Sequence, residues 1–156
     1  MKTSPMPAAI KRLVTTSFIY MLVAIVAGAV AISRNLPAQP MGEGSGTGRP
    51  VLQEFLIGNG TAMSPGLPWL AVQVLLTLLA VRGDRWGTIS VALLGFHALL
   101  SGIFATTEPI FRKIFSPATF DPLLAVVETC IVVLPFLIVA LAGLELQRRL
   151  RARSGR

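Results

Sequence analysis

Four long runs of apolar residues, separated by short polar segments, dominate the chain. They cover roughly residues 13–33, 65–81, 86–105 and 122–144. A helix of about 20 residues crosses a hydrocarbon layer of about 30 Å, and each run is near that length. The pattern therefore predicts an all-α polytopic membrane protein, in which residues 1–156 form a single domain built on a bundle of four transmembrane helices.

The third run carries two different faces when it is drawn as a helix. Its polar side chains fall within roughly 20° of one line, and they are Ser90, His97, Ser101 and Glu108. A second line holds only small residues, namely Gly95, Ala98, Gly102 and Ala105. Small residues let another helix backbone approach closely, so we expect one face to meet polar partners and the other to pack tightly.

The second and fourth runs also carry polar lines. Gln73 and Thr77 share one face of the second, whereas Glu128 and Pro135 are seven residues apart on the fourth. At 1.5 Å per residue, Glu128, Gln73 and His97 all lie in the outer half of the layer or near its middle. Because ionisable groups facing lipid are costly, we expect these lines to turn inward. The candidate ligand-binding or proton-binding residues are Glu128, His97, Gln73, Thr77 and Ser101.

In this hypothesis Glu128 accepts a proton or cation, His97 is its partner, and the other three orient them. The alternative is structural: Glu128 bonds to His97 or to a backbone carbonyl and fixes the helix register. Pro135 is expected to kink the fourth helix near mid-membrane and to free the carbonyl of Ile131. No metal site or cofactor is expected, because one histidine and the single Cys130 provide too few ligands for zinc or a bis-histidine haem.

The net charge of +7 gains meaning from its location. Ten of the fourteen basic residues fall on one predicted side of the membrane, and they are Lys2, Lys11, Arg12, Arg82, Arg85, Arg148, Arg149, Arg151, Arg153 and Arg156. The positive-inside rule then makes both termini cytoplasmic. This distribution argues against a nucleic-acid partner. It favours the lipid bilayer of a cell membrane, and the arginine bias and compact loops suggest a bacterial inner membrane.

The cytoplasmic tail, residues 145–156, is rich in arginine. Arg148, Arg149, Arg151 and Arg153 are candidates for binding anionic lipid headgroups, and a simple topology anchor is the alternative. The first run also resembles a secretory signal, since Ala29-Val30-Ala31 looks like a cleavage site. Its length and long polar leader favour a retained helix.

The external loop, residues 34–64, is expected to be flexible where Gly42 to Gly48 alternates glycine with polar residues. A short interfacial helix is predicted over Pro50–Ile57, with the proline as its first helical residue and Gly58 ending it. Ser64 and Pro65 are predicted to start the second span as N-cap and first helical residue, and Asp121 to cap the fourth.

Three functional hypotheses remain open. The first is a protein, expected to be a homo-oligomer, that binds or transports a small molecule, a proton or a cation through a polar intramembrane pocket. The second is a structural or accessory subunit of a larger membrane complex. The third is a membrane enzyme acting on a lipid-like substrate, for which no nucleophile motif is found. Size and topology resemble those of the DoxX-like group and the small multidrug transporters, but the latter carry their glutamate in the first span, and we assign no family.

Overall fold

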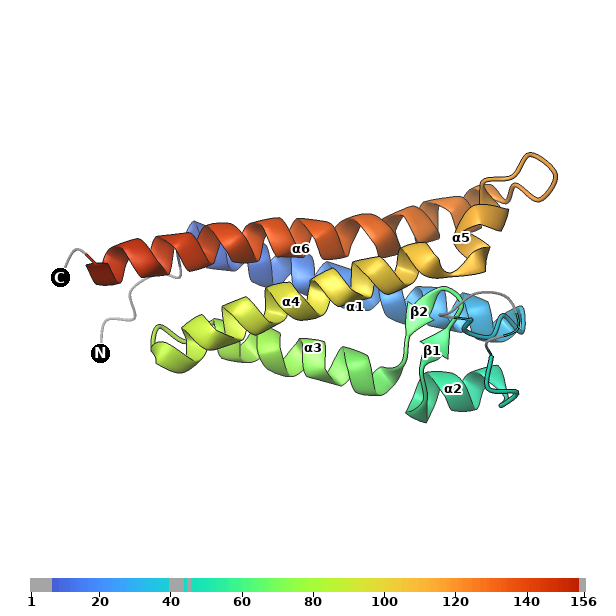
Figure 1. Cartoon of the computed structure of the whole chain (residues 1–156), viewed down its shortest axis with the longest axis horizontal. Helices are drawn as coiled ribbons and strands as arrows, with labels where there is room; N and C mark the ends of the chain where they lie inside the picture. Colours follow the sequence, from blue (N-terminus) through green and yellow to red (C-terminus); the bar gives the residue numbers. More distant parts are fainter. Residues whose placement is uncertain (1–6, 40–43, 45, 155–156) are drawn as a thin grey trace.

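The computed structural model describes residues 7–39, 44 and 46–154. Its elements, in chain order, are α1 (Ala8–Ser33), α2 (Val51–Ile57), β1 (Gly60–Thr61), β2 (Ser64–Pro65), α3 (Leu67–Ala80), α4 (Arg85–Thr107), α5 (Pro109–Ile114) and α6 (Pro122–Ser154). Four helices, α1, α3, α4 and α6, lie along one long axis, and the small elements gather at one end (Figure 1). We call that end the outer end. The tail residues 155 and 156, Lys2 and part of the predicted flexible linker (40–43 and 45) lie outside the described residues.

Three helices are long and apolar enough to cross a membrane, namely α1, α4 and α6. The predicted second span corresponds to α3, an apolar helix of 14 residues. At 1.5 Å per residue this helix is only about 21 Å long, shorter than a hydrocarbon layer of about 30 Å. The protein is thus mostly helical, with three candidate membrane spans and one shorter apolar helix among its described residues.

The small-residue line of α4 packs against α6, as its spacing predicted. A Cβ atom added at Gly95 would lie 3.1 Å from the Cβ of Ala142, and one added at Gly102 would lie 3.0 Å from the ring of Phe136. Ala98, between them, is fully buried. The small residues let α4 and α6 approach closely along an extensive interface, in which the ring of Phe136 fits against Gly102.

The turn between α3 and α4 makes these helices antiparallel neighbours (Figure 1). Asp84 caps α4, because its carboxylate accepts the backbone N–H of Gly87 at 2.9 Å. A Cβ atom on Gly87 would lie 1.9 Å from the carbonyl oxygen of Arg82, so only glycine fits this turn. Asp121 caps α6 as predicted, accepting the backbone N–H groups of Leu123 and Leu124 at 3.0 and 3.1 Å.

The predicted start of the second span at Ser64 and Pro65 is wrong. These residues form β2, which pairs with β1, and α3 begins at Leu67 with Gly66 as its N-cap. The physical reason is a close approach of two backbone segments. A Cβ atom on Gly66 would lie 2.5 Å from the carbonyl oxygen of Gly58. The segment is therefore held in the extended hairpin before the helix begins.

The hairpin and α2 lie at the outer end of the bundle, beside α1 and the start of α3 (Figure 1). The predicted helix is confirmed as α2, which ends at Gly58, although Pro50 is its N-cap and not its first residue. Phe55 of α2 lies against Gly28 of α1, where an added Cβ would be 2.5 Å from its ring. The backbone N–H of Ala62 donates to the carbonyl of Leu36 at 3.2 Å, which ties the hairpin to the end of α1.

The fourth predicted span is confirmed as helical, but α6 extends well past residue 144, to Ser154. It passes through Pro135 without interruption, and Pro135 is buried. The residues assigned from sequence to a separate tail therefore continue the helix. This extension brings Glu145 and Arg149 into the interior at the inner end.

Candidate functional site

A cavity of about 430 Å³ lies beneath the hairpin at the outer end of the bundle. Helices α1, α3, α4 and α6 and the hairpin segment all contribute to its wall. Its lining residues are Tyr20, Gly58, Asn59, Thr61, Ala62, Met63, Ser64, Pro65, Pro68, Trp69, Ser101, Phe104, Ala105, Glu108, Glu128 and Ile131. Small-molecule sites commonly have volumes of about 300–1,000 Å³ and mostly apolar walls with a few polar groups. We call this space the outer cavity.

Glu128 is the most unusual group in the wall of the outer cavity. Its exposed fraction is 0%, and neither carboxylate oxygen has a hydrogen-bond partner among the described residues. Burying a carboxyl group without partners is costly, because water no longer solvates it and nothing replaces the water. The polar line predicted for α6 is confirmed in its direction, since Glu128, Pro135 and Ala142 are all buried.

Glu108, at the end of α4, is the second acid of the outer cavity. Its two carboxylate oxygens accept the backbone N–H of Gln39, at 3.1 and 2.9 Å, which holds the chain after α1 against α4. Burial raises the pKa of Glu108 to about 7, although the bond from Gln39 acts in the opposite direction. Glu108 therefore changes charge near neutral pH.

Ring stacking and hydrogen bonds join α3 to α4 at the cavity wall, through Trp69, Ser101 and His97. The indole N–H of Trp69 donates to the hydroxyl of Ser101 at 2.7 Å, and that hydroxyl donates to the carbonyl of His97 at 3.0 Å. The rings of Trp69 and His97 stack with centroids 4.1 Å apart and planes 23° apart. The imidazole Nε2 is buried without a partner among the described residues. Ser101 faces the cavity, while His97 lies behind Trp69.

Gln73 and Thr77 belong to a separate polar network. The amide of Gln73 donates to the hydroxyl of Ser17 on α1 at 2.8 Å, and the hydroxyls of Ser17 and Thr77 lie 2.6 Å apart. The Thr77 hydroxyl also bonds to the carbonyl of Gln73 at 2.7 Å. All three residues are fully buried. This network joins α1 to α3 and takes no part in lining the outer cavity.

The five residues expected to converge are thus divided between two places. Ser101 and Glu128 line the outer cavity, and His97 lies just behind its wall. No hydrogen bond joins His97 to Glu128, since neither carboxylate oxygen has a partner in the described part of the chain. Gln73 and Thr77 contact Ser17 instead, because the rotation of α3 directs its polar line toward α1.

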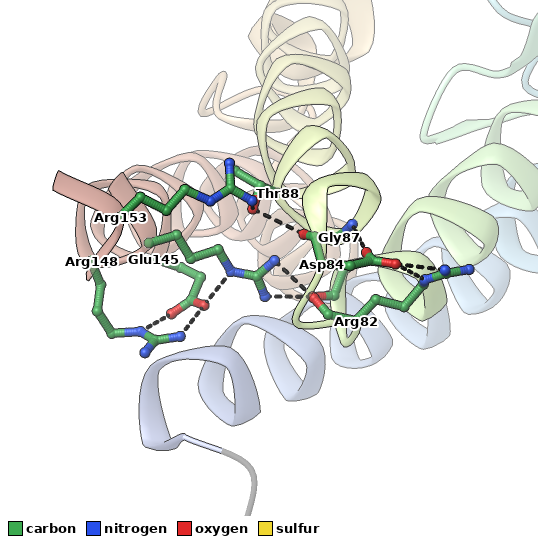
Figure 2. Close-up of polar contacts among 9 residues, drawn as sticks. Arg82, Asp84, Gly87, Thr88, Glu145, Arg148 and Arg153 are labelled. Carbon is green, nitrogen blue, oxygen red and sulfur yellow. Dashed lines mark hydrogen bonds and ion pairs between the residues drawn. The ribbon is translucent and has the colours of Figure 1, made fainter. Parts of the chain in front are cut away.

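At the inner end, Glu145, Arg148 and Arg149 of α6 form a cluster of paired charges, which we call the inner cluster (Figure 2). The carboxylate of Glu145 accepts two bonds from Arg148, at 2.8 and 2.7 Å, and one from Arg149 at 2.6 Å. Arg149 also donates to the carbonyls of Ala80 and Arg82, at 2.7 and 3.0 Å. It therefore satisfies carbonyl groups at the end of α3, where a cation is favoured by the helix dipole.

The four arginines proposed to bind lipid headgroups have different environments. Arg149 is buried in the inner cluster, and Arg148, although exposed, is paired with Glu145. Arg153 is exposed and donates to the hydroxyl of Thr88 on α4 at 3.0 Å. Arg151 is exposed. Only the three exposed side chains face the surface, where an anionic headgroup would meet them.

Sequence reasoning missed several residues of these two sites. Glu108 stood on the same polar line as His97 and Ser101, which is a signal that could have included it. Trp69 and Tyr20 were not among the candidate residues, yet both line the outer cavity. Glu145 precedes Arg148 and Arg149 by three and four residues, a spacing that brings side chains together on a helix.

Comparison with protein-family models, with curated proteins and with solved structures finds no match to this chain.

Proposed function

We propose that this chain crosses a cell membrane four times, with α3 as a short fourth span and both termini in the cytoplasm. The first turn of α1 and the last turn of α6 lie at the same end of the bundle (Figure 1). Lys11, Arg12 and the arginines of the inner cluster are at this end, which supports a cytoplasmic location. At the outer end, the hairpin precedes α3, so that the hairpin and this short helix together cross the membrane.

The hairpin can lie at membrane depth because several of its backbone groups are hydrogen-bonded within the protein. Its two strands pair with each other, Pro37 pairs with Thr61, and the N–H of Met63 donates to the hydroxyl of Thr61 at 3.3 Å. Non-helical backbone is tolerated at this depth when it is buried in protein or lines a cavity. Thr61 and Ser64 are both buried, and both line the outer cavity.

We propose that the protein binds a small molecule in the outer cavity and that Glu128 anchors it. The observation that carries this proposal is the fully buried carboxylate of Glu128, without partners in the described residues, in the wall of a cavity of about 430 Å³. An ionisable group inside a membrane is costly, and it marks a ligand or ion pathway by default. Glu108 is the second acid, and Trp69 and Ser101 shape the wall between them.

The same arrangement gives the site a direction. Below the outer cavity, Ser17, Gln73 and Thr77 bond to one another between α1 and α3. Farther inward, Arg149 of the inner cluster joins α6 to the end of α3 and to the α3–α4 turn, through its bonds to the carbonyls of Ala80 and Arg82 (Figure 2). In this state a ligand would therefore enter and leave from the outer side. Transport would require the inner contacts to open, whereas binding alone would not.

Accessibility to water from outside tests the proposal. In a Cys130→Ser background, Glu128→Cys and Ala105→Cys each place a thiol in the cavity wall. Val126→Cys is the matched control. Val126 lies on the same helix as Glu128, but its side chain points away from the bundle toward lipid, and its exposed fraction is 63%. A membrane-impermeant maleimide added to intact cells should label both cavity positions much faster than Val126→Cys, since thiols in lipid do not ionise.

Two results would overturn the proposal. In variants that fold and insert normally, protection of both cavity positions would mean a sealed core without a binding site. Labelling only after the membrane is opened would place the cavity on the cytoplasmic side and reverse the topology.

A further inference from the structure

We infer that the ligand of the outer cavity is an organic ammonium ion that carries at least one N–H group and an apolar or aromatic body. This inference rests on the proposed function and specifies its substrate class. Three independent properties of the wall support it: its charge, its hydrogen-bonding groups and its aromatic rings.

The charge of the wall has one sign. Its two ionisable carboxylates are Glu108 and Glu128, and no lysine, arginine or histidine is among the described residues that line it. The chain's single histidine, His97, stacks on Trp69 and is not one of the lining residues. An anionic ligand would meet like charge in a poorly solvated space, whereas a cation would replace the missing counter-charge of Glu128.

The hydrogen-bonding groups then distinguish between kinds of cation. Both oxygens of Glu128 lack a donor in the described chain. Ser101 does not supply one, because its hydroxyl proton is directed at the carbonyl of His97. The missing donors must come from the ligand, and a primary or secondary ammonium provides two or three N–H groups. A quaternary ammonium provides none, so it would leave the buried oxygens unsatisfied.

The size and the rings of the cavity suit an organic cation better than a bare metal ion. Ca²⁺ takes six to eight oxygen ligands, and two carboxylates, one of which is already bonded to Gln39, supply too few. Tyr20, Trp69 and Phe104 instead offer aromatic surface along the wall. Aromatic faces attract organic cations and pack against apolar groups. A cavity of about 430 Å³ also has room for a body attached to the charged group.

The two tryptophans make a direct binding measurement possible. Trp69 lines the cavity, whereas Trp86 lies at the start of α4 with 64% of its surface exposed. In the full-length Trp86→Phe variant, purified in detergent micelles, Trp69 is the sole tryptophan and reports on the cavity. The probes share one phenethyl body: 2-phenylethylammonium, its N,N,N-trimethyl analogue, 2-phenylethanol, and 3-phenylpropanoate.

We expect 2-phenylethylammonium to change the fluorescence of Trp69 saturably below about 10 mM, with a Kd at least about tenfold lower than those of the other three probes. Glu128→Gln, in the same Trp86→Phe background, should weaken ammonium binding by about tenfold or more and leave binding of the alcohol within about twofold. Val126→Gln serves as the control for a polar change on α6 outside the cavity, and should leave every Kd unchanged.

Four outcomes would overturn the inference. They are equal affinity for the ammonium and the alcohol, preference for the carboxylate, preference for the trimethyl analogue, and no saturable response to the primary ammonium. The maleimide experiment separates these failures from failure of the proposed function. A cavity that is labelled from outside but prefers the alcohol still binds small molecules, and only its substrate class would be wrong.

Discussion

Two glutamates of α6, Glu145 and Glu128, are equally buried, yet their environments are opposite. Both have an exposed fraction of 0%. The carboxylate of Glu145 accepts three hydrogen bonds from two arginines (Figure 2). The carboxylate of Glu128 accepts none from the described residues. One helix thus contains a fully paired acid at the inner end and an unpaired acid in the wall of the outer cavity.

This difference separates a structural acid from a binding acid. A buried charge is tolerated when it is paired and hydrogen-bonded, and its removal then leaves the partner uncompensated. The inner cluster meets this description, because Arg149 connects Glu145 to the carbonyl groups that end α3. An unpaired buried acid only destabilises the fold, so its presence is better explained by something it binds.

The largest effect is expected from Glu145→Ala. This change leaves Arg149, whose exposed fraction is 9%, with its two carbonyl acceptors but without an anionic partner. Breaking a buried ion pair by removing one partner costs about 3–5 kcal/mol. We therefore expect the free energy of unfolding in mixed micelles, measured by titration with a denaturing detergent, to fall by about 3 kcal/mol.

Arg151→Ala is the control for loss of one charged side chain from the same part of α6. Arg151 is exposed, so its removal should change stability by no more than about 0.5 kcal/mol. If the two variants unfold at the same detergent fraction, the inner cluster does not stabilise the fold, and Glu145 is not a structural acid.

A smaller effect, and one that depends on pH, is expected at Glu108. Burial raises the pKa of its carboxyl group from 4.5 to about 7, so the folded protein binds this proton more tightly than the unfolded chain does. Stability must then fall as the pH rises from about 4.5 to about 7, and remain constant above that range. The loss is on the order of 2 kcal/mol.

The measurement is the melting temperature at intervals across this pH range, for the original protein and for Glu108→Gln. Glutamine does not titrate, so the variant should show a smaller dependence on pH. Equal slopes for the two proteins would show that Glu108 does not carry the pH dependence.

Periodicity in the sequence was sufficient to locate the four long helices approximately and to group the residues that share a face on each. The small-residue line of α4 packs on α6, and the polar lines predicted for α3, α4 and α6 are buried, namely Gln73, Thr77, Ser90, His97, Ser101, Glu108 and Glu128. These results follow because a helix fixes which residues share a face. Caps such as Asp121 were also predictable, since a capping residue acts on backbone groups two or three residues away.

The rotation of each helix about its axis was not predictable in the same way. Gln73 turns toward Ser17 on α1, a residue that no local pattern connects to it, and the expected site is divided as a result. The hairpin was missed because its two-residue strands are held by contacts with distant segments, such as the bond from Ala62 to Leu36. The outer cavity therefore depended on long-range packing that one sequence does not reveal.

The smallest change in stability, and the sharpest test of the contrast, is expected from Glu128→Gln. Glutamine has nearly the same shape, and it removes a buried ionisable group that has no partner to lose. We therefore expect the free energy of unfolding to stay within about 1 kcal/mol of the original value or to increase slightly. The detergent titration used for Glu145→Ala measures both variants on one scale.

A loss of stability as large as that of Glu145→Ala would mean that the Glu128 carboxylate stabilises the fold through its own contacts. Glu128 would then be a second structural acid and not a binding acid. Unchanged stability together with weaker binding of 2-phenylethylammonium would assign its burial to the ligand.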